Sequence, residues 1–243
     1  MGETNESRLE QARHDVSPRK LQKQMAIASA ACTVFGREGY ARASVDALAA
    51  AAGVSTRTLY NHFPGGKAQL FQTVVTWTSS EVRDAQLARL HAVLDPERPP
   101  HPDDLERDLV SLARAFHGLM TDYANHFALV RHIHAEADHV PPEVLRAWHE
   151  AGPEPVGRAL TEAMTHLEDA GLLNLHGDAA VAAGHFTALI SHRIVQTTHY
   201  GVLPLPEPET DRLLRAGVSA FLRAYGAAWT AVVAESGAGS PPP

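Results

Sequence analysis

Residues 44–67 read SVDALAAAAGVSTRTLYNHFPGGK, and this stretch predicts two short helices joined by a tight turn. Ser44 and Ser55 stand where the two helices begin, and serine is a favoured N-cap residue. Gly53 lies between them, where glycine readily adopts the left-handed conformation that ends a helix. Pro64 cannot continue the second helix because it lacks an N–H group. We therefore predict a helix-turn-helix.

The second predicted helix has an apolar side and a polar side. Leu59 and Phe63 lie four residues apart and supply the apolar side. The polar side chains can donate hydrogen bonds to phosphates and base edges, and no acidic residue lies among them. Arg57, at the exposed start of the helix, can bind a guanine through two hydrogen bonds. The predicted DNA-contacting residues on or beside this helix are Ser44, Ser55, Thr56, Arg57, Thr58, Tyr60, Asn61, His62 and Lys67.

Some of the basic and polar residues near this motif have a purely structural alternative. Ser44 either caps its helix alone or also contacts a phosphate. Lys67 lies at the start of the next helix, where its ammonium and the free backbone amides both attract phosphate. For Arg19, Lys20 and Lys23 there are two interpretations. They either contact the DNA backbone beside the motif or form a charged helix start that is simply exposed to water.

The charge of the chain is divided unevenly along its length. The net charge is -7, which by itself disfavours binding to nucleic acid. Residues 18–70, however, carry seven basic and two acidic side chains, a net charge of +5, and hold all three lysines. Residues 71–243 carry a net charge of -10. A small basic module on an acidic body suits local contact with a polyanion and opposes indiscriminate binding.

The composition predicts an all-α fold. Many segments have the 3.6-residue period of a helix, and none sustains the two-residue period of a strand. Cys32 is the only cysteine, so a disulfide within the chain is impossible and a reducing cytoplasm is the expected compartment. No stretch of about 18 apolar residues is present, so no membrane span is predicted.

We expect a disordered basic and acidic arm over residues 1–17 and a disordered tail over residues 234–243. Between them lie a three-helix DNA-binding domain, residues 18–66, and a larger helical ligand-binding and dimerisation domain, residues 67–233. Apolar periodicity, glycine and proline place the helices outside the motif at residues 18–37, 67–94, 103–120, 123–137, 143–150, 155–170, 178–200 and 207–233.

Several short motifs cluster in the N-terminal part. They are residues 35–40 (FGREGY), 44–45, 48–49, 52–55, 58–60 and 62–67. With these motifs the segment resembles the TetR family of bacterial transcriptional regulators. The resemblance implies a homodimer on a palindromic operator, a ligand pocket in the C-terminal body, and release of DNA when that pocket is filled. It also implies phosphate contacts for Tyr60 and His62.

Large apolar residues recur in the predicted C-terminal helices. Such residues usually form the core, and this alternative stays open for each of them. As a set, they offer aromatic and methionine walls for an apolar or amphipathic ligand, and histidines would add a few polar groups. The candidate ligand-binding residues are Trp77, Phe116, Met120, Tyr123, Phe127, His134, Trp148, Met164, His185 and Phe186.

Histidine is frequent, with 15 residues. His132 and Glu136, like His134 and Asp138, have the i,i+4 spacing that can place two metal ligands on one helix face. Surface imidazoles are the interpretation we favour, because no cysteine accompanies them and no HExxH pattern occurs. We therefore predict no metal site and no cofactor. A second group of histidines, with a seven-residue spacing, comprises His185, His192 and His199.

The last two predicted helices are rich in alanine and glycine, which permits close helix packing. They are predicted to form a four-helix dimer interface, with packing inside one subunit as the alternative. The sequence thus predicts a cytoplasmic, homodimeric repressor that a small apolar or amphipathic ligand releases from a double-stranded DNA operator. A metal- or pH-responsive regulator is the alternative. No catalytic residues are predicted, because no nucleophile–base pair or phosphate-binding loop occurs.

Overall fold

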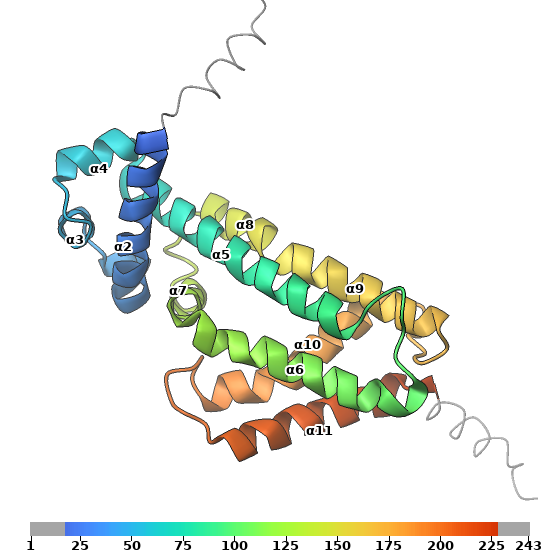
Figure 1. Cartoon of the computed structure of the whole chain (residues 1–243). Coiled ribbons are helices and arrows are strands. Elements are labelled where there is room, and N and C mark those ends of the chain that lie inside the picture. Colours follow the sequence, from blue (N-terminus) through green and yellow to red (C-terminus); the bar gives the residue numbers. More distant parts are fainter. Residues whose placement is uncertain (1–17, 228–243) are drawn as a thin grey trace, which may run out of the picture.

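Residues 18–227 are described by a computed structural model, in which helices are joined by loops (Figure 1). Within this range the extended backbone pairing is limited to an isolated bridge between Leu173 and Gly226. The predicted all-α fold is therefore confirmed. The disorder predicted for residues 1–17 and 234–243 concerns segments outside the described residues.

The N-terminal part consists of three helices, α2 (Pro18–Arg42), α3 (Val45–Ala51) and α4 (Thr56–His62). Ser44 Oγ accepts a hydrogen bond from the Ala47 amide at 3.1 Å. Ser55 Oγ accepts one from the Thr58 amide, also at 3.1 Å. Gly53, between α3 and α4, has a φ of 62°, which is the left-handed conformation expected there. The helix-turn-helix forms as the sequence predicts.

One backbone feature interrupts α2 close to its C-terminal end. Gly39 has φ 77° and ψ 175°, far from helical values, and the chain then completes a short turn to Arg42. The sequence places the end of this helix at residue 37, two residues before the break. The break redirects the chain toward α3 and leaves the backbone of residues 39–41 open to neighbouring helices.

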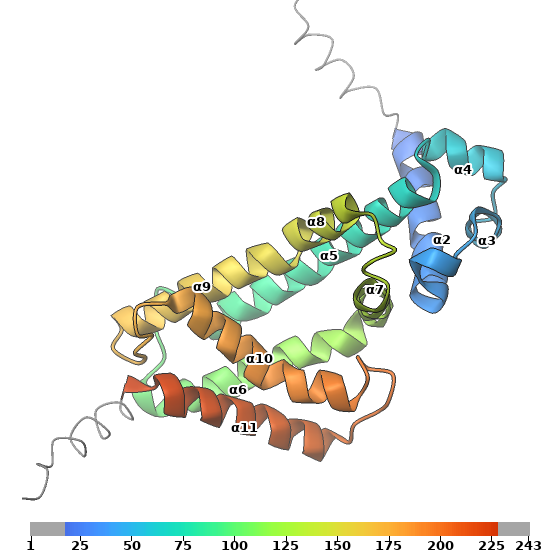
Figure 2. The ribbon, with the colours of Figure 1, turned by 180° about the vertical axis from the view of Figure 1, so that it is seen from behind.

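The body begins with α5 (Gly66–Val93), which leaves the helix-turn-helix and runs into the remaining helices (Figure 1). Both views place α8 and α9 end to end along α5, while α10 packs against α11 and α9, and α6 packs against α11 and α5 (Figures 1 and 2). After α5 the chain forms a short 3-10 turn (Pro102–Asp104), α6 (Leu105–Asp122), α7 (Ala124–Ala135), α8 (Pro142–Ala151), α9 (Pro153–Asp169), α10 (Ala179–Thr197) and α11 (Glu207–Tyr225).

The predicted end of α10 at residue 200 is wrong, because the helix ends at Thr197. His199 and Tyr200 have positive φ angles of 48° and 57°, which a continuing helix does not allow. Thr198 Oγ1 accepts a hydrogen bond from the Gly201 amide at 3.0 Å and so stabilises this turn.

The last helix, predicted to run to about residue 233, is interrupted at Gly226, and α11 ends at Tyr225. Ala227 is helical again. Gly226 is extended, with φ -68° and ψ 128°. The Tyr225 carbonyl accepts a hydrogen bond from the Asn174 amide at 2.7 Å, so the loop between α9 and α10 pairs with the chain that leaves α11. Residues 228–233 lie outside the described residues.

Two hydrophobic cores hold these helices together. One packs α6, α9, α10 and α11 in the body. The other contains the buried side chains of α2, α3 and α4, and it continues into Leu70 and Phe71 of α5 and into Leu129 and Ile133 of α7. Val144 of α8 belongs to the same cluster, so the helix-turn-helix shares its core with three body helices, α5, α7 and α8.

Candidate nucleic-acid interface and ligand cavity

The outward face of α4 is polar and accessible. Arg57, Tyr60 and Asn61 are exposed, whereas Leu59 is fully buried against the other two N-terminal helices. The Arg57 guanidinium has no hydrogen bond or ion pair with any residue between 18 and 227. Thr56, Thr58 and His62 are half-buried on the flanks of this face.

Ser44, Ser55 and Lys67, also predicted to contact DNA, have partners within the chain. The two serine hydroxyls accept hydrogen bonds as N-caps. Ser55 Oγ also shares a hydrogen bond with Thr58 Oγ1 at 2.8 Å, whereas the Ser44 hydroxyl hydrogen has no acceptor among the described residues. Lys67 Nζ donates to the carbonyls of Tyr40 and Ala41, at 3.0 and 3.3 Å, and lies 4.6 Å from the centre of the Tyr40 ring. Its ammonium thus holds the end of α2, and its contact with phosphate stays a prediction.

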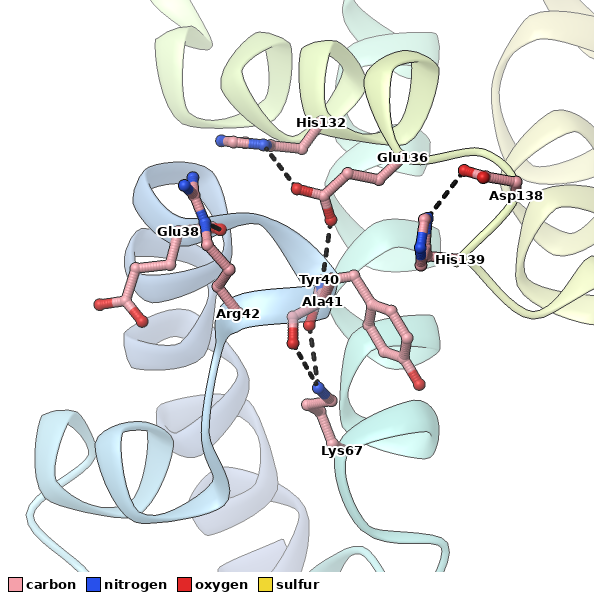
Figure 3. Close-up of polar contacts among 9 residues, drawn as sticks. All are labelled: Glu38, Tyr40, Ala41, Arg42, Lys67, His132, Glu136, Asp138 and His139. Atoms are coloured by element: carbon pink, nitrogen blue, oxygen red, sulfur yellow. Dashed lines mark hydrogen bonds and ion pairs between the residues drawn. The ribbon is translucent and has the colours of Figure 1, made fainter.

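The chain around Ala41 is also held from the body side, by the residue that follows α7 (Figure 3). Glu136 Oε2 accepts a hydrogen bond from the Ala41 amide at 3.0 Å. The other carboxylate oxygen lies 3.4 Å from His132 Nδ1. A Cβ added to Gly39 would overlap Glu136 Oε1, so glycine leaves the space that the Glu136 carboxylate occupies. We call Gly39, Ala41, Lys67 and Glu136 the junction.

A cavity of about 280 Å³ lies in the body among α5, α6, α7, α8, α9 and α10. Phe116, Phe127 and Trp148, three of the predicted ligand-binding residues, line it together. None of its lining residues is an Asp, Glu, Lys or Arg. The other lining residues are Ser79, Val82, Gln86, His126, Val130, Gly152, Pro153, Val156, Gly157, Leu160 and Thr187.

Two buried polar side chains that line this cavity, His126 and Ser79, were not predicted from the sequence. His126, 8% exposed, has its Nδ1 3.1 Å from Thr78 Oγ1. The Thr78 hydroxyl donates to the Val74 carbonyl at 3.0 Å, so its oxygen accepts from His126 Nδ1. Ser79 is 2% exposed, and its buried Oγ has no hydrogen-bond partner among the described residues. No signal in the sequence separates these residues from other buried polar side chains. Helical periodicity shows which face of a helix is buried, but it does not show which residues of different helices meet at a cavity.

The other predicted ligand-binding residues lie outside this cavity. Trp77 and Tyr123 line a separate, more polar cavity of about 340 Å³ beside α2. Met164 and Phe186 are fully buried in the body core, which agrees with the structural alternative. The remaining three lie apart: Met120 beside Gly201, His134 against the rings of Trp148 and Tyr200, and His185 with its Nδ1 2.6 Å from the Tyr225 hydroxyl.

The histidine pairs are used in different ways. His132 faces Glu136 at the junction. Asp138 pairs with His139 at 2.8 Å rather than with His134. His199 lies beyond the end of α10, so the seven-residue repeat does not continue on one helix. Among residues 18–227 no group of three or more potential metal ligands comes together.

Family models match both parts of the chain. The model described as "Bacterial regulatory proteins, tetR family" matches residues 27–74, and that of the "AefR-like transcriptional repressor, C-terminal domain" matches residues 107–227. A TetR-family regulator of known structure from Mesorhizobium loti is 30% identical over 86% of this chain and 100% of its own, with a TM-score of 0.73. The chain belongs to the TetR family.

Other solved structures are also similar to this chain over most of its length. The flavonoid-responsive regulator FrrA is 27% identical, with a TM-score of 0.63, over 84% of this chain and 97% of its own. A regulator from Pseudomonas syringae is 26% identical, with a TM-score of 0.61, over the same shares. No curated protein matches the sequence significantly. This TetR-family protein is thus a DNA-binding transcriptional regulator and not an enzyme.

No helix between residues 18 and 227 is long and apolar enough to cross a membrane.

Burial of His126 in this regulator predicts a pH-dependent stability. Burial lowers the pKa of His126 from 6.5 to about 4. Between these values the unfolded chain binds a proton that the folded chain does not, so unfolding becomes easier as the pH falls. We expect this residue alone to lower the free energy of unfolding by up to about 3 kcal/mol between about pH 6.5 and 4, and to have no such effect above pH 6.5.

Urea unfolding of the wild type and of His126→Asn across this pH range measures the effect. Asparagine can still donate to Thr78 but does not titrate. The difference in stability between the two proteins should change steeply below about pH 6.5. A constant difference across the range would show that His126 is not the source of the acid sensitivity.

Proposed function

We propose that this regulator is a homodimeric repressor that a small molecule releases from a palindromic operator. The observation that carries the proposal concerns α7. Its first turns line the body cavity with His126, Phe127 and Val130, and the residue after its last turn, Glu136, holds the Ala41 amide of the DNA-binding part. One helix therefore connects the cavity with the backbone from which the helix-turn-helix extends.

In this proposal, the ligand releases the repressor from DNA by shifting the population from one arrangement of α7 to another. A ligand that fits the cavity better when α7 is displaced stabilises that arrangement over the DNA-binding one. Displacement of α7 moves Glu136 and the shared core residues Leu129 and Ile133, and with them the spacing of the two recognition helices. To change the DNA-binding population from 99% to 1%, the ligand must discriminate between the two arrangements by about 5.5 kcal/mol.

We assign the DNA contacts to the sequence-predicted set. We expect Arg57 and Asn61, which are exposed on α4, to read bases. Tyr60 and His62 at the end of α4, together with Ser44, Ser55 and Lys67, would contact phosphates. The two parts of the chain, residues 18–66 and 67–233, take the DNA-binding role and the ligand-binding and dimerisation role, and the site of action is the cytoplasm.

Dimerisation is assigned to α10 and α11. The small residues there divide into two groups: Ala182, Ala183 and Gly217 are buried within the subunit, whereas Ala180, Gly184 and Ala188 are exposed. Val181 and Leu189, 47% and 40% exposed, lie on α10 near the exposed small residues. Apolar and small side chains on one open helix permit close packing against a second copy.

Selection of bound duplexes from a random DNA pool tests the proposal. A homodimer is expected to select an inverted repeat whose half-sites lie about one helical turn or a multiple of it apart. Fluorescence anisotropy on the selected operator, followed across salt concentration, then separates specific from nonspecific binding. A non-repeated site, or retention that has no sequence preference, would contradict the dimeric repressor.

A further inference from the structure

We propose that the body cavity binds a compact, uncharged aromatic molecule that carries a hydroxyl group, about the size of a two-ring system. The inference rests on the proposed function only in using the same cavity, since it concerns which molecules bind and not what binding does to DNA. Four features of the cavity carry it: its volume, the absence of charge, its aromatic walls and two polar atoms that lack partners.

The volume limits the ligand to a small ring system. At about 280 Å³ the cavity lies at the lower end of ligand pockets in proteins. An engineered apolar protein cavity of about 150 Å³ binds benzene. A cavity of nearly twice that volume accommodates two fused rings, whereas a long acyl chain with a large headgroup does not fit.

The absence of charge excludes ionic ligands. No acidic or basic side chain lines the cavity, and burial holds the His126 imidazole neutral at pH 7. A ligand carboxylate or ammonium would lose its hydration without gaining an ion pair, which carries a large free-energy penalty. Phe116, Phe127 and Trp148 instead provide ring faces and edges against which an aromatic ligand can stack.

The polar atoms specify a hydroxyl. Because the Thr78 hydroxyl donates to the Val74 carbonyl, His126 Nδ1 carries the proton and Nε2 is left as an acceptor. Nε2 has no partner among the described residues. A ligand hydroxyl can donate to it, and a ligand oxygen can accept from the buried, unpartnered Ser79 Oγ. Leaving a buried hydroxyl unpaired is unfavourable, so a ligand with oxygen is preferred over a hydrocarbon.

A larger cleft between α6 and α11, about 570 Å³, is a weaker candidate. Arg114 and Asp211, which line it, already form an ion pair with each other, and Asp211 also pairs with Arg215. These two charged groups therefore have partners without a ligand, unlike Ser79.

Three matched probes test the inference with the full chain in the absence of DNA. They are 2-naphthol, naphthalene, which lacks the hydroxyl, and 2-naphthoate, which carries a carboxylate. Binding is measured by isothermal titration calorimetry. We expect 2-naphthol to bind on the order of tenfold more tightly than naphthalene, and 2-naphthoate not to bind at the concentrations at which 2-naphthol saturates the protein.

Two serine variants locate the binding. Ser79→Ala removes the unpartnered hydroxyl and should lower the ratio of 2-naphthol to naphthalene affinity, while the preference that remains reports the hydrogen bond to His126 Nε2. Ser80→Ala is the matched control: its hydroxyl donates to the Thr76 carbonyl and does not line the cavity, so the ratio should stay as in the wild type. A stable, folded Ser79→Ala protein is expected, because the substitution only removes an unsatisfied group.

Failure to bind 2-naphthol, tighter binding of 2-naphthoate, or an unchanged ratio in Ser79→Ala would each overturn the inference. Operator release by 2-naphthol is scored separately. Binding without release would support the ligand class while contradicting the proposed release mechanism, so the two proposals fail in distinguishable ways.

Discussion

Replacing Arg57 by alanine is expected to weaken operator binding by about 2–6 kcal/mol, a loss of at least about thirtyfold. Each bidentate contact between an arginine and a guanine contributes about 1–3 kcal/mol of discrimination, and a dimer makes the contact twice. Arg57 is exposed on α4 and has no partner among residues 18–227 that would compete for its guanidinium. The loss should therefore appear in DNA binding and not in folding.

Anisotropy titrations with the selected operator and with its single-base variants measure this effect. If Arg57 reads a base, the variant protein should lose its preference at one position of each half-site. Arg158→Ala, an exposed residue on α9 in the body, removes the same charge and should leave operator affinity unchanged. A uniform loss across all sequences with a smaller salt dependence would assign Arg57 to a phosphate instead.

Gly39→Ala is expected to destabilise the protein by about 1–3 kcal/mol from backbone strain alone, because φ 77° with ψ 175° is a conformation nearly restricted to glycine. A second cost arises from contact, since the new Cβ would overlap Glu136 Oε1 and would lie 2.8 Å from His132 Nδ1. The Glu136 side chain can swing away, but it then loses its hydrogen bond to the Ala41 amide.

A double-mutant cycle with Glu136→Ala separates these two costs in urea unfolding. In the Glu136→Ala background the contact with the carboxylate is absent, so Gly39→Ala should cost less than in the wild type, and the remainder is backbone strain together with the contact to His132 Nδ1. Gly36→Ala serves as the control, because its Cβ would meet only ordinary contacts at 3.5 Å and beyond, and it should be neutral or slightly stabilising. An equal cost of Gly39→Ala in both backgrounds would show that Glu136 does not press on residue 39.

The helix-turn-helix was predictable from the sequence because its determinants are local. The N-caps Ser44 and Ser55 act on amides three residues ahead, and Gly53 supplies a φ angle that depends on its own backbone. The burial of Leu59 and Phe63 follows from helical spacing. Helix ends were predicted less well where distant contacts decide them. At the end of α11, for example, the Tyr225 carbonyl, next to Gly226, accepts a hydrogen bond from Asn174 in the loop before α10.

The cavity and the junction were decided by tertiary structure. The helical pattern of large apolar residues and histidines predicted ten candidate ligand residues, yet only Phe116, Phe127 and Trp148 come together at the cavity. The i,i+4 spacing of His132 and Glu136 suggested a metal pair, while in the fold the carboxylate holds the amide of Ala41, 95 residues away in sequence.

The sequence by itself determined the all-α class, the helix-turn-helix and the polar face of α4, since each depends on neighbours within about one helical turn. Only the tertiary structure decided that Ser79 and His126 face one cavity and that α7 links this cavity to Ala41. The physical reason is that periodicity fixes which face of a helix is buried, whereas the distance and angle between helices depend on how their side chains interlock.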